Sequence, residues 1–150
     1  MGREIMFRGK RKDTGEWVEG SYVLLEENHF IIPSQLEIDD SLCAEVPKFV
    51  LIQPETLGQY TGVEDKNGKP IYEGDIVTNK WCFYHEHSVV KFGEHKHWTM
   101  TSDYKCGMLG FYVDHPYDEH QSLRKDLMYF AGNCEVVGNI HDNPELLEGK

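Results

Sequence analysis

Short apolar runs separated by turn-forming residues recur along the chain, and this pattern is typical of a protein built mainly from β-strands. Two early runs are rich in β-branched and aromatic residues and flank a polar turn, so we expect them to form an opening hairpin. Proline or glycine ends several of the later runs, as it does at many strand boundaries. The expected strands are residues 5–8, 17–25, 29–32, 49–52, 75–78, 88–92, 108–113 and 134–140.

Helical periodicity is confined to one longer segment. Leu123, Leu127 and Phe130 fall at i, i+4 and i+7, and Asp118 can cap the start, which predicts one inserted helix near 118–130. After the last strand, residues 142–147 combine an Asx cap with an early proline and predict a short C-terminal helical turn.

Glycine turns are the most distinctive feature, above all in residues 58–77. Asn67-Gly68 is the dipeptide that tolerates positive φ at both central positions of a hairpin turn, and Gly74 stands immediately before the strand expected at 75–78. We expect Gly68, Gly74 and Gly138 to hold special backbone positions. Many short strands with glycine turns predict a mainly β fold, a small SH3-like or partly open β-barrel elaborated by the N-terminal hairpin.

The length of 150 residues is that of one ordinary domain, so a single domain over 1–150 is expected. The formal net charge of −11 repels a phosphate backbone and disfavours direct binding of nucleic acid. The sequence has neither a signal-peptide pattern nor an apolar run near 18 residues, so a cytoplasmic protein without membrane association is expected.

Charge is unevenly distributed along the chain. Residues 1–12 are strongly basic, whereas residues 13–47 contain nine acids and no Lys or Arg. This division either decorates two solvent faces differently or attracts the basic segment of one subunit to an acidic neighbour. For the second alternative, the candidate residues for contact with a subunit or partner are Arg3, Arg8, Arg11 and Lys12.

The four cysteines lie far apart and form no C-x-x-C pair, so zinc-finger spacing is absent. In a cytoplasmic protein they are expected to be reduced and partly buried thiols.

The histidines form the one group of residues in the sequence whose side chains could bind a metal ion or carry other chemistry. His85 and His87 stand at i and i+2, as do His95 and His97, so each pair would share a strand face with Cα atoms about 6.6 Å apart. Imidazoles at this distance can share a metal ion, with Cys82 and His115 as conceivable further ligands.

The expected geometry argues against joining the two histidine pairs. If Gly93-Glu94 is a two-residue turn, His97 faces Val90, and the two pairs point to opposite faces of the hairpin. Solvent-facing histidines are therefore expected. A pH-sensitive cluster, and a metal site completed by a neighbouring subunit, remain as alternatives.

Recognisable catalytic devices are missing from the sequence. It contains no G-x-S-x-G elbow, no phosphate-binding G-x-x-x-x-G-K-[ST] loop and no H-E-x-x-H motif. We therefore assign no catalytic, cofactor-binding or metal-binding residue and expect no cofactor.

Four separated segments, residues 3–10, 15–20, 58–77 and 137–147, together resemble the YopX family of phage and prophage proteins. They occur in the family's order and span nearly the whole chain, whereas residues 78–130 depart most from its pattern. The resemblance implies a small phage-encoded cytoplasmic protein, mainly β and oligomeric, and it carries no catalytic residue over.

Three functional hypotheses follow. The first is a non-enzymatic, homo-oligomeric accessory protein that binds a host or phage protein through β-edges, loops and its acidic surface. The second is a metal-dependent hydrolase that uses histidines of residues 85–97. The third is an acidic decoy for a nucleic-acid-binding protein of the host, motivated by the net charge.

Overall fold

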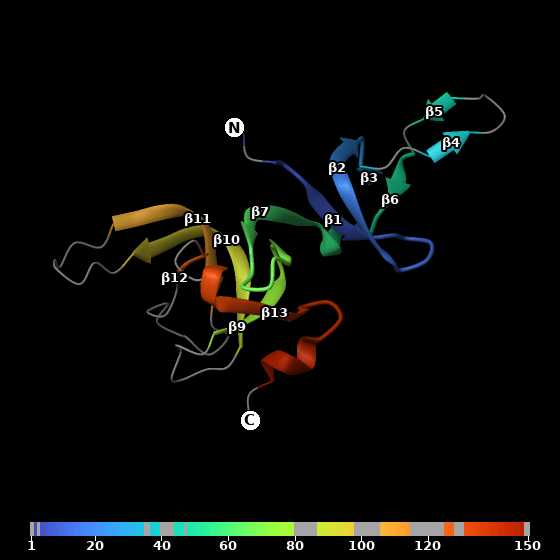
Figure 1. Ribbon diagram of the computed structural model, residues 1–150. Coiled ribbons are helices and arrows are strands. Elements are labelled where there is room, and N and C mark those ends of the chain that lie inside the picture. The colour runs from blue at the N-terminus through green and yellow to red at the C-terminus, as the bar shows by residue number, and fades with distance from the viewer. Residues whose placement is uncertain are drawn as a thin grey trace. The chain divides into compact units, whose positions relative to one another are not determined.

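The computed structural model describes residues 2, 4–34, 37–39, 44–46, 48–79, 87–97, 106–114, 125–127 and 131–148. The chain packs as two compact units, Met1–Tyr60 and Thr61–Lys150. Each unit is built around antiparallel strands (Figure 1). Among the described residues, no helix has the length and apolarity to cross a membrane.

The first unit is an antiparallel sheet in the order β6-β3-β2-β1-β7, in which β7 pairs with β1 through Gly58 and Gln59. A separate pair, β4 and β5, and the 3-10 helix η1 complete the described elements. The bounds are β1 (Phe7–Lys10), β2 (Trp17–Leu25), β3 (Asn28–Pro33), β4 (Glu37–Asp39), β5 (Ala44–Val46), β6 (Val50–Leu51), η1 (Pro54–Thr56) and β7 (Gly58–Glu64).

The core of the first unit lies where β6, at the edge of the sheet, pairs with β3. Ile31, Val50 and Ile52 are buried there, and an isolated bridge joins Ile52 to Arg11. Gly9 lies so close that an added Cβ would be 2.7 Å from Ile52 Cδ1. Packing at this density leaves no room for a side chain at Gly9.

The second unit holds a five-stranded antiparallel sheet in the order β12-β11-β10-β9-β13, while β8 lies beside β7. The bounds are β8 (Pro70–Tyr72), β9 (Asp75–Asn79), β10 (His87–His97), β11 (Cys106–Asp114), β12 (Lys125–Asp126), η2 (Ala131–Asn133), β13 (Cys134–Asn139) and η3 (Pro144–Leu147).

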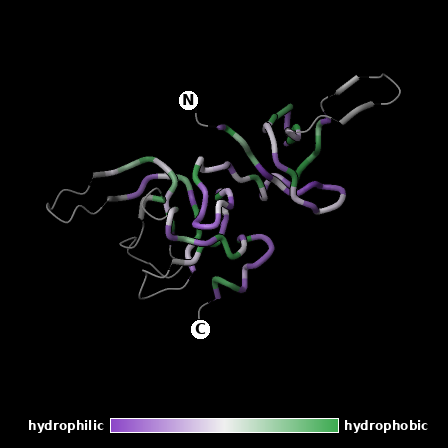
Figure 2. The backbone as a smooth tube through the Cα atoms, viewed as in Figure 1, coloured by the Kyte–Doolittle hydropathy of each residue, from purple (hydrophilic) through white to green (hydrophobic). Residues whose placement is uncertain are grey.

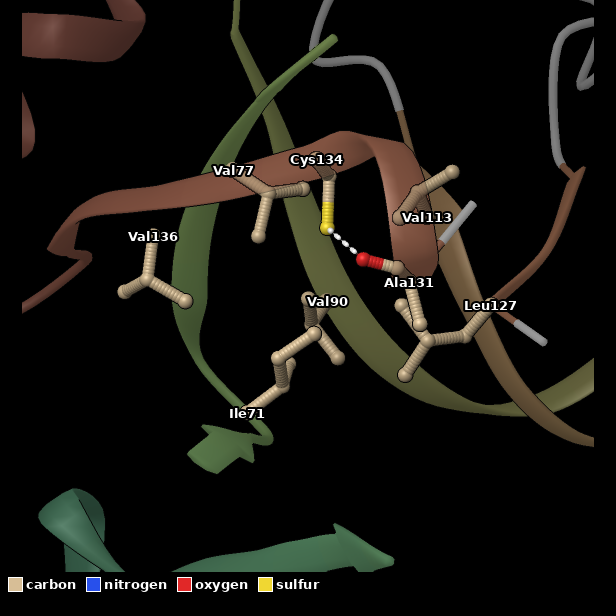
Figure 3. Packing of buried hydrophobic residues seen from close by; sticks show 8 residues of the cluster. All are labelled: Ile71, Val77, Val90, Val113, Leu127, Ala131, Cys134 and Val136. Carbon is tan, nitrogen blue, oxygen red and sulfur yellow. Dashed lines mark hydrogen bonds between the residues drawn. The ribbon is translucent and has the colours of Figure 1, made fainter. Parts of the chain in front are cut away.

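The core of the second unit is a cluster of buried apolar side chains from strands that are distant in sequence (Figure 3). Cys134 lies within it as a free, fully buried thiol and donates its S–H to the carbonyl of Ala131 at 3.5 Å. Burial raises the pKa of the Cys134 thiol to about 11, because the thiolate would lose its hydration. The cluster consists of Ile71, Val77, Val90, Val113, Leu127, Ala131, Cys134 and Val136.

The mainly β fold and the opening β1–β2 hairpin are confirmed. The SH3-like barrel is not confirmed, because the sheets do not close. The predicted C-terminal turn is present as η3 with Pro144 near its start, although the side chain of Asn143 makes no capping hydrogen bond.

The helix predicted near 118–130 is wrong as a continuous element. Lys125 and Asp126 form β12 and pair with Val113 and Tyr112 of β11, while residues 115–124 and 128–130 lie outside the described residues. Leu127, which had supplied part of the helical period, is buried in the core instead. The spacing of Leu123, Leu127 and Phe130 matches a helix face, but the same spacing is compatible with a short strand followed by a single buried leucine.

Candidate interaction sites

The outer part of the β10–β11 pair, residues 91–97 and 106–112, forms a two-stranded extension that we call the hairpin arm (Figure 1). The turn predicted at Gly93-Glu94 is wrong, because β10 continues to His97, which pairs with Cys106. Gly93 is paired across the strands with Gly110. Gly93 has a φ of 157°, which residues with a side chain rarely adopt, and this backbone conformation is the reason for a glycine here.

Two aromatic rings stack on one face of the hairpin arm. His95 and Tyr112 stack with ring centroids 5.2 Å apart and an interplanar angle of 28°. A Cβ added at Gly93 would lie 3.6 Å from Tyr112 Cε1, and one added at Gly110 would lie 3.9 Å from His95 Cε1. The glycine pair thus provides the floor on which the rings lie, and both side chains are buried.

The other face of the hairpin arm continues the apolar core outward. Phe92 and Phe111 pack edge to face with centroids 5.0 Å apart, and Phe111 also contacts the core cluster. Beyond them, Leu109 is 72% exposed and Phe92 is 49% exposed. Exposed apolar side chains next to one another mark interaction surfaces more often than isolated ones do.

The β11 strand of the arm is uncharged from Cys106 to Tyr112, whereas β10 carries Lys91, Glu94 and Lys96. Figure 2 colours the backbone of both strands by hydropathy. Within the described part of the chain, β12 pairs with β11 only at Tyr112 and Val113. Among the described residues, the stretch 107–110 therefore has a ladder neighbour on the β10 side alone. This stretch is an uncharged sheet edge, which natural proteins usually protect with charge or cover.

The structure describes only some of the histidines considered as metal ligands. His87 and His95 lie on β10, but His95 is buried against Tyr112 and does not face solvent as we expected. His85, Cys82, His115 and the side chain of His97 lie outside the described residues. Among the side chains that the structure describes, no three or more His, Cys, Asp or Glu residues gather as metal ligands.

A second candidate lies in the first unit, where the β1–β2 turn meets the start of β6. A pocket of about 400 Å³, which we call the basic pocket, opens between these segments. It brings Arg11 and Lys12 together with Lys48 and the ring of Phe49, which is 49% exposed and packs edge-on against Phe30. The lining residues are Arg11, Lys12, Asp13, Lys48, Phe49, Val50 and Leu51.

The acidic residue of the basic pocket, Asp13, already accepts hydrogen bonds from Arg11. Arg11 donates to Asp13 Oδ1 from Nε at 3.0 Å and to Oδ2 from Nη2 at 2.8 Å. These hydrogen bonds hold the pKa of Asp13 well below its usual range. Asp13 therefore stays ionised and fixes the turn, while Lys12 and Lys48 add positive charge at the rim.

The four residues predicted to contact a subunit or partner lie in different surroundings. Arg11 and Lys12 line the basic pocket, whereas the guanidinium of Arg8 lies 4.7 Å from the ring centre of Trp17, with Lys10 Nζ at 5.5 Å from the same ring. Arg3 lies outside the described residues. Sequence reasoning missed Lys48 and Phe49, because they are far from residues 1–12 in the chain.

The three glycines singled out by the sequence occupy distinct backbone settings. Gly68 has φ of 80° and Gly74 has φ of 85°, both in the left-handed region. At Gly138, which follows a bulge in the pairing of β13 with β9, an added Cβ would lie 2.5 Å from Asn143 Oδ1. Asn67 does not adopt positive φ, so the predicted turn with two such residues is wrong.

Asp65 closes this loop instead, and the sequence analysis did not identify it. Its Oδ1 accepts hydrogen bonds from the backbone N–H of Asn67 at 2.8 Å and of Lys69 at 3.0 Å, and its Oδ2 accepts one from Val136 N–H at 3.0 Å. Burial raises the pKa of Asp65, but the three backbone donors outweigh burial and leave the pKa below its usual value. The carboxylate is a structural anchor between the β7–β8 loop and β13.

Comparison with known proteins locates the chain in one family. The profile of the family described as YopX protein matches residues 6–148. A solved structure described as protein EF1440 from Enterococcus faecalis shares 19% sequence identity, with 97% of this chain and 99% of that chain covered and a TM-score of 0.46. No curated protein matches the chain.

Proposed function

Because this chain belongs to the YopX family over residues 6–148, we propose that it is a phage or prophage accessory protein that binds another protein without catalysing a reaction. Its binding element is the hairpin arm, where an extended segment of the partner adds a strand to the edge of β11. The protein works as a homo-oligomer in the host cytoplasm.

The uncharged edge of β11 carries this proposal. A strand at the edge of a sheet presents N–H and C=O groups to any extended chain, and natural proteins usually block it with charges, prolines or a covering element. Residues 106–112 contain no charge and no proline, in a protein whose net charge is −11. Such an edge is a liability in solution unless another chain pairs with it.

Strand addition explains the side chains as well as the edge. In this mode, main-chain hydrogen bonds supply affinity and alternate side chains supply specificity. Leu109 projects from the same face as Phe111, while Met108 projects from the face of the His95–Tyr112 stack. A partner strand with apolar residues at alternate positions would cover the exposed Leu109 on the phenylalanine face.

Site-specific photo-crosslinking tests this proposal. We expect a benzophenone amino acid at position 109 to form a discrete adduct in host cells and the same residue at position 137 to form none. Val137 is a matched control because it is an exposed apolar residue on a strand, 39% exposed, outside the arm. The adduct should disappear when Met108→Lys charges the edge of β11.

Native mass spectrometry of the untagged protein, before and after a chelator, tests the remaining parts. A closed oligomer whose mass does not change with chelator would support the proposal. One metal ion per subunit or per interface would contradict the non-enzymatic role and support the metal-dependent hydrolase. Equal adducts at positions 109 and 137 would reject the arm as the binding element.

A further inference from the structure

Two parts of the first unit are complementary in charge and in apolar character. One is the basic pocket, and the other is the turn between β2 and β3, residues 24–27, which we call the acidic turn. We propose that the basic pocket binds the acidic turn of a second copy of this chain. This inference deepens the oligomeric part of the proposed function and uses a surface different from the β11 edge.

The acidic turn is unusual because it exposes leucines beside its charges. Leu24 is 53% exposed and Leu25 is 50% exposed, and Glu26 and Glu27 follow directly at the tip. Neighbouring residues of a strand point to opposite faces, so the tip presents an apolar side chain on either face. Solvent alone gives no reason for two exposed leucines at a hairpin tip.

Glu26 also holds the tip in a defined shape. Its φ of 54° is the one positive value among the described residues other than glycine. Leu25 pairs with Asn28, so only two residues make the connection. A two-residue hairpin tip is a compact, preorganised group, which loses little conformational entropy when it binds.

The basic pocket offers the matching chemistry. Arg11, Lys12 and Lys48 line it together with Asp13, whose carboxylate is held by Arg11. The half-exposed ring of Phe49 supplies an apolar wall for a leucine. The two glutamates of the acidic turn would meet the lysines at the rim while a leucine covers Phe49.

Charge complementarity favours a second copy as the occupant. Two chains of net charge −11 repel each other at long range, so association requires local patches of opposite sign. The basic pocket and the acidic turn are such patches, and every copy carries both. The pocket and the turn share no residue, so each copy can use both at once. Two copies can therefore form the contact reciprocally, or several copies can form it head to tail in a ring.

A charge-swap experiment tests the contact. The pocket variant carries Lys12→Glu and Lys48→Glu, and the turn variant carries Glu26→Lys and Glu27→Lys. Native mass spectrometry should find each variant dissociated at a concentration where the natural chain is assembled. An equimolar mixture should reassemble, because in an alternating arrangement every pocket again faces a turn of opposite charge.

Matched controls separate this contact from a general effect of charge. Glu4→Lys with Glu55→Lys changes the net charge by the same amount as the turn variant at two exposed positions of the first unit, and it should leave the assembly intact. Circular dichroism should find all variants folded, since the exchanged side chains of Lys12, Lys48 and the two turn glutamates are exposed.

The outcomes distinguish this inference from the proposed function. Variants that stay assembled, or a mixture that stays dissociated, would overturn the turn-in-pocket contact, even while photo-crosslinking at position 109 supports strand addition. A natural chain that is monomeric at every concentration would overturn both this contact and the oligomeric part of the proposed function.

Discussion

Asp65 provides the sharpest test of how the second unit is held together. The side chain is 6% exposed and accepts three backbone hydrogen bonds, two within its own loop and one from Val136 of β13. Asp65→Ala removes both acceptor oxygens and with them all three hydrogen bonds. The N–H of Val136, a residue that is 8% exposed, would then lose its acceptor in a buried position.

The expected cost follows from these contacts. A hydrogen bond to a charged group contributes about 1.5–3 kcal/mol, which we assign to the buried Val136 N–H. The N–H groups of Asn67 and Lys69 lie in exposed residues and can turn to water, so each is assigned about 0.5–1.5 kcal/mol. Together these contributions predict a loss of about 2.5–6 kcal/mol of unfolding free energy. For a chain of this length that lowers Tm by about 5–24 °C.

The pH dependence provides an independent measurement. The pKa of Asp65 is lower in the folded than in the unfolded state, so its stabilisation is complete above the unfolded pKa near 3.9 and is lost as the pH falls through the folded pKa. In urea titrations at a series of pH values, Asp65→Asn should therefore differ most from the natural protein near neutral pH. The difference should shrink below about pH 4.

Glu64→Gln is the matched control, because it removes one charge from the exposed residue before Asp65, at the end of β7. It should leave Tm nearly unchanged. If Asp65→Ala melts with the control, or if the difference between Asp65→Asn and the natural protein does not change with pH, the assignment of Asp65 as an anchor is refuted.

Further predictions concern the backbone and the two cores. Gly74→Val should cost at least about 1–2 kcal/mol, because φ of 85° is unfavourable for a β-branched residue. An unchanged Tm in a thermal melt would contradict this. Leu127→Ala should cost about 2–5 kcal/mol by leaving a cavity in the core of the second unit, measured by urea unfolding. Ile31→Ala should lower the unfolding free energy by a similar amount through a cavity in the first unit. If both units unfold as one domain, calorimetry should give a single transition for either variant. Lys66→Ala should change stability by less than about 1 kcal/mol, because both side chains of its ion pair with Glu135 are more than a third exposed.

The strands could be predicted from the sequence because their signals are local. Apolar runs ending at turn formers located β2 and β13 to within a residue or so, since side-chain composition and turn chemistry act over a few positions. The Asp65 loop carried a local signal too. An aspartate two residues before Asn67-Gly68 is typical of a side chain that caps its own turn.

The register of the hairpin arm could not be predicted in the same way. A glycine at 93 fits a turn as well as it fits a strand, and the choice depends on its pairing with Gly110 on another strand. The basic pocket depends in the same way on tertiary structure, because Lys12 and Lys48 come together only after the first unit folds. Sequence alone indicated a basic segment but not the aromatic wall beside it.

The buried thiol of Cys134 gives the second unit a built-in reporter of its own opening. With its pKa raised to about 11, the thiol holds little thiolate at neutral pH, and the core that surrounds it keeps reagents out. A maleimide or disulfide reagent can therefore react with Cys134 only during excursions that expose this core. The labelling rate at this single atom counts those excursions under native conditions, without denaturant and without an engineered labelling site.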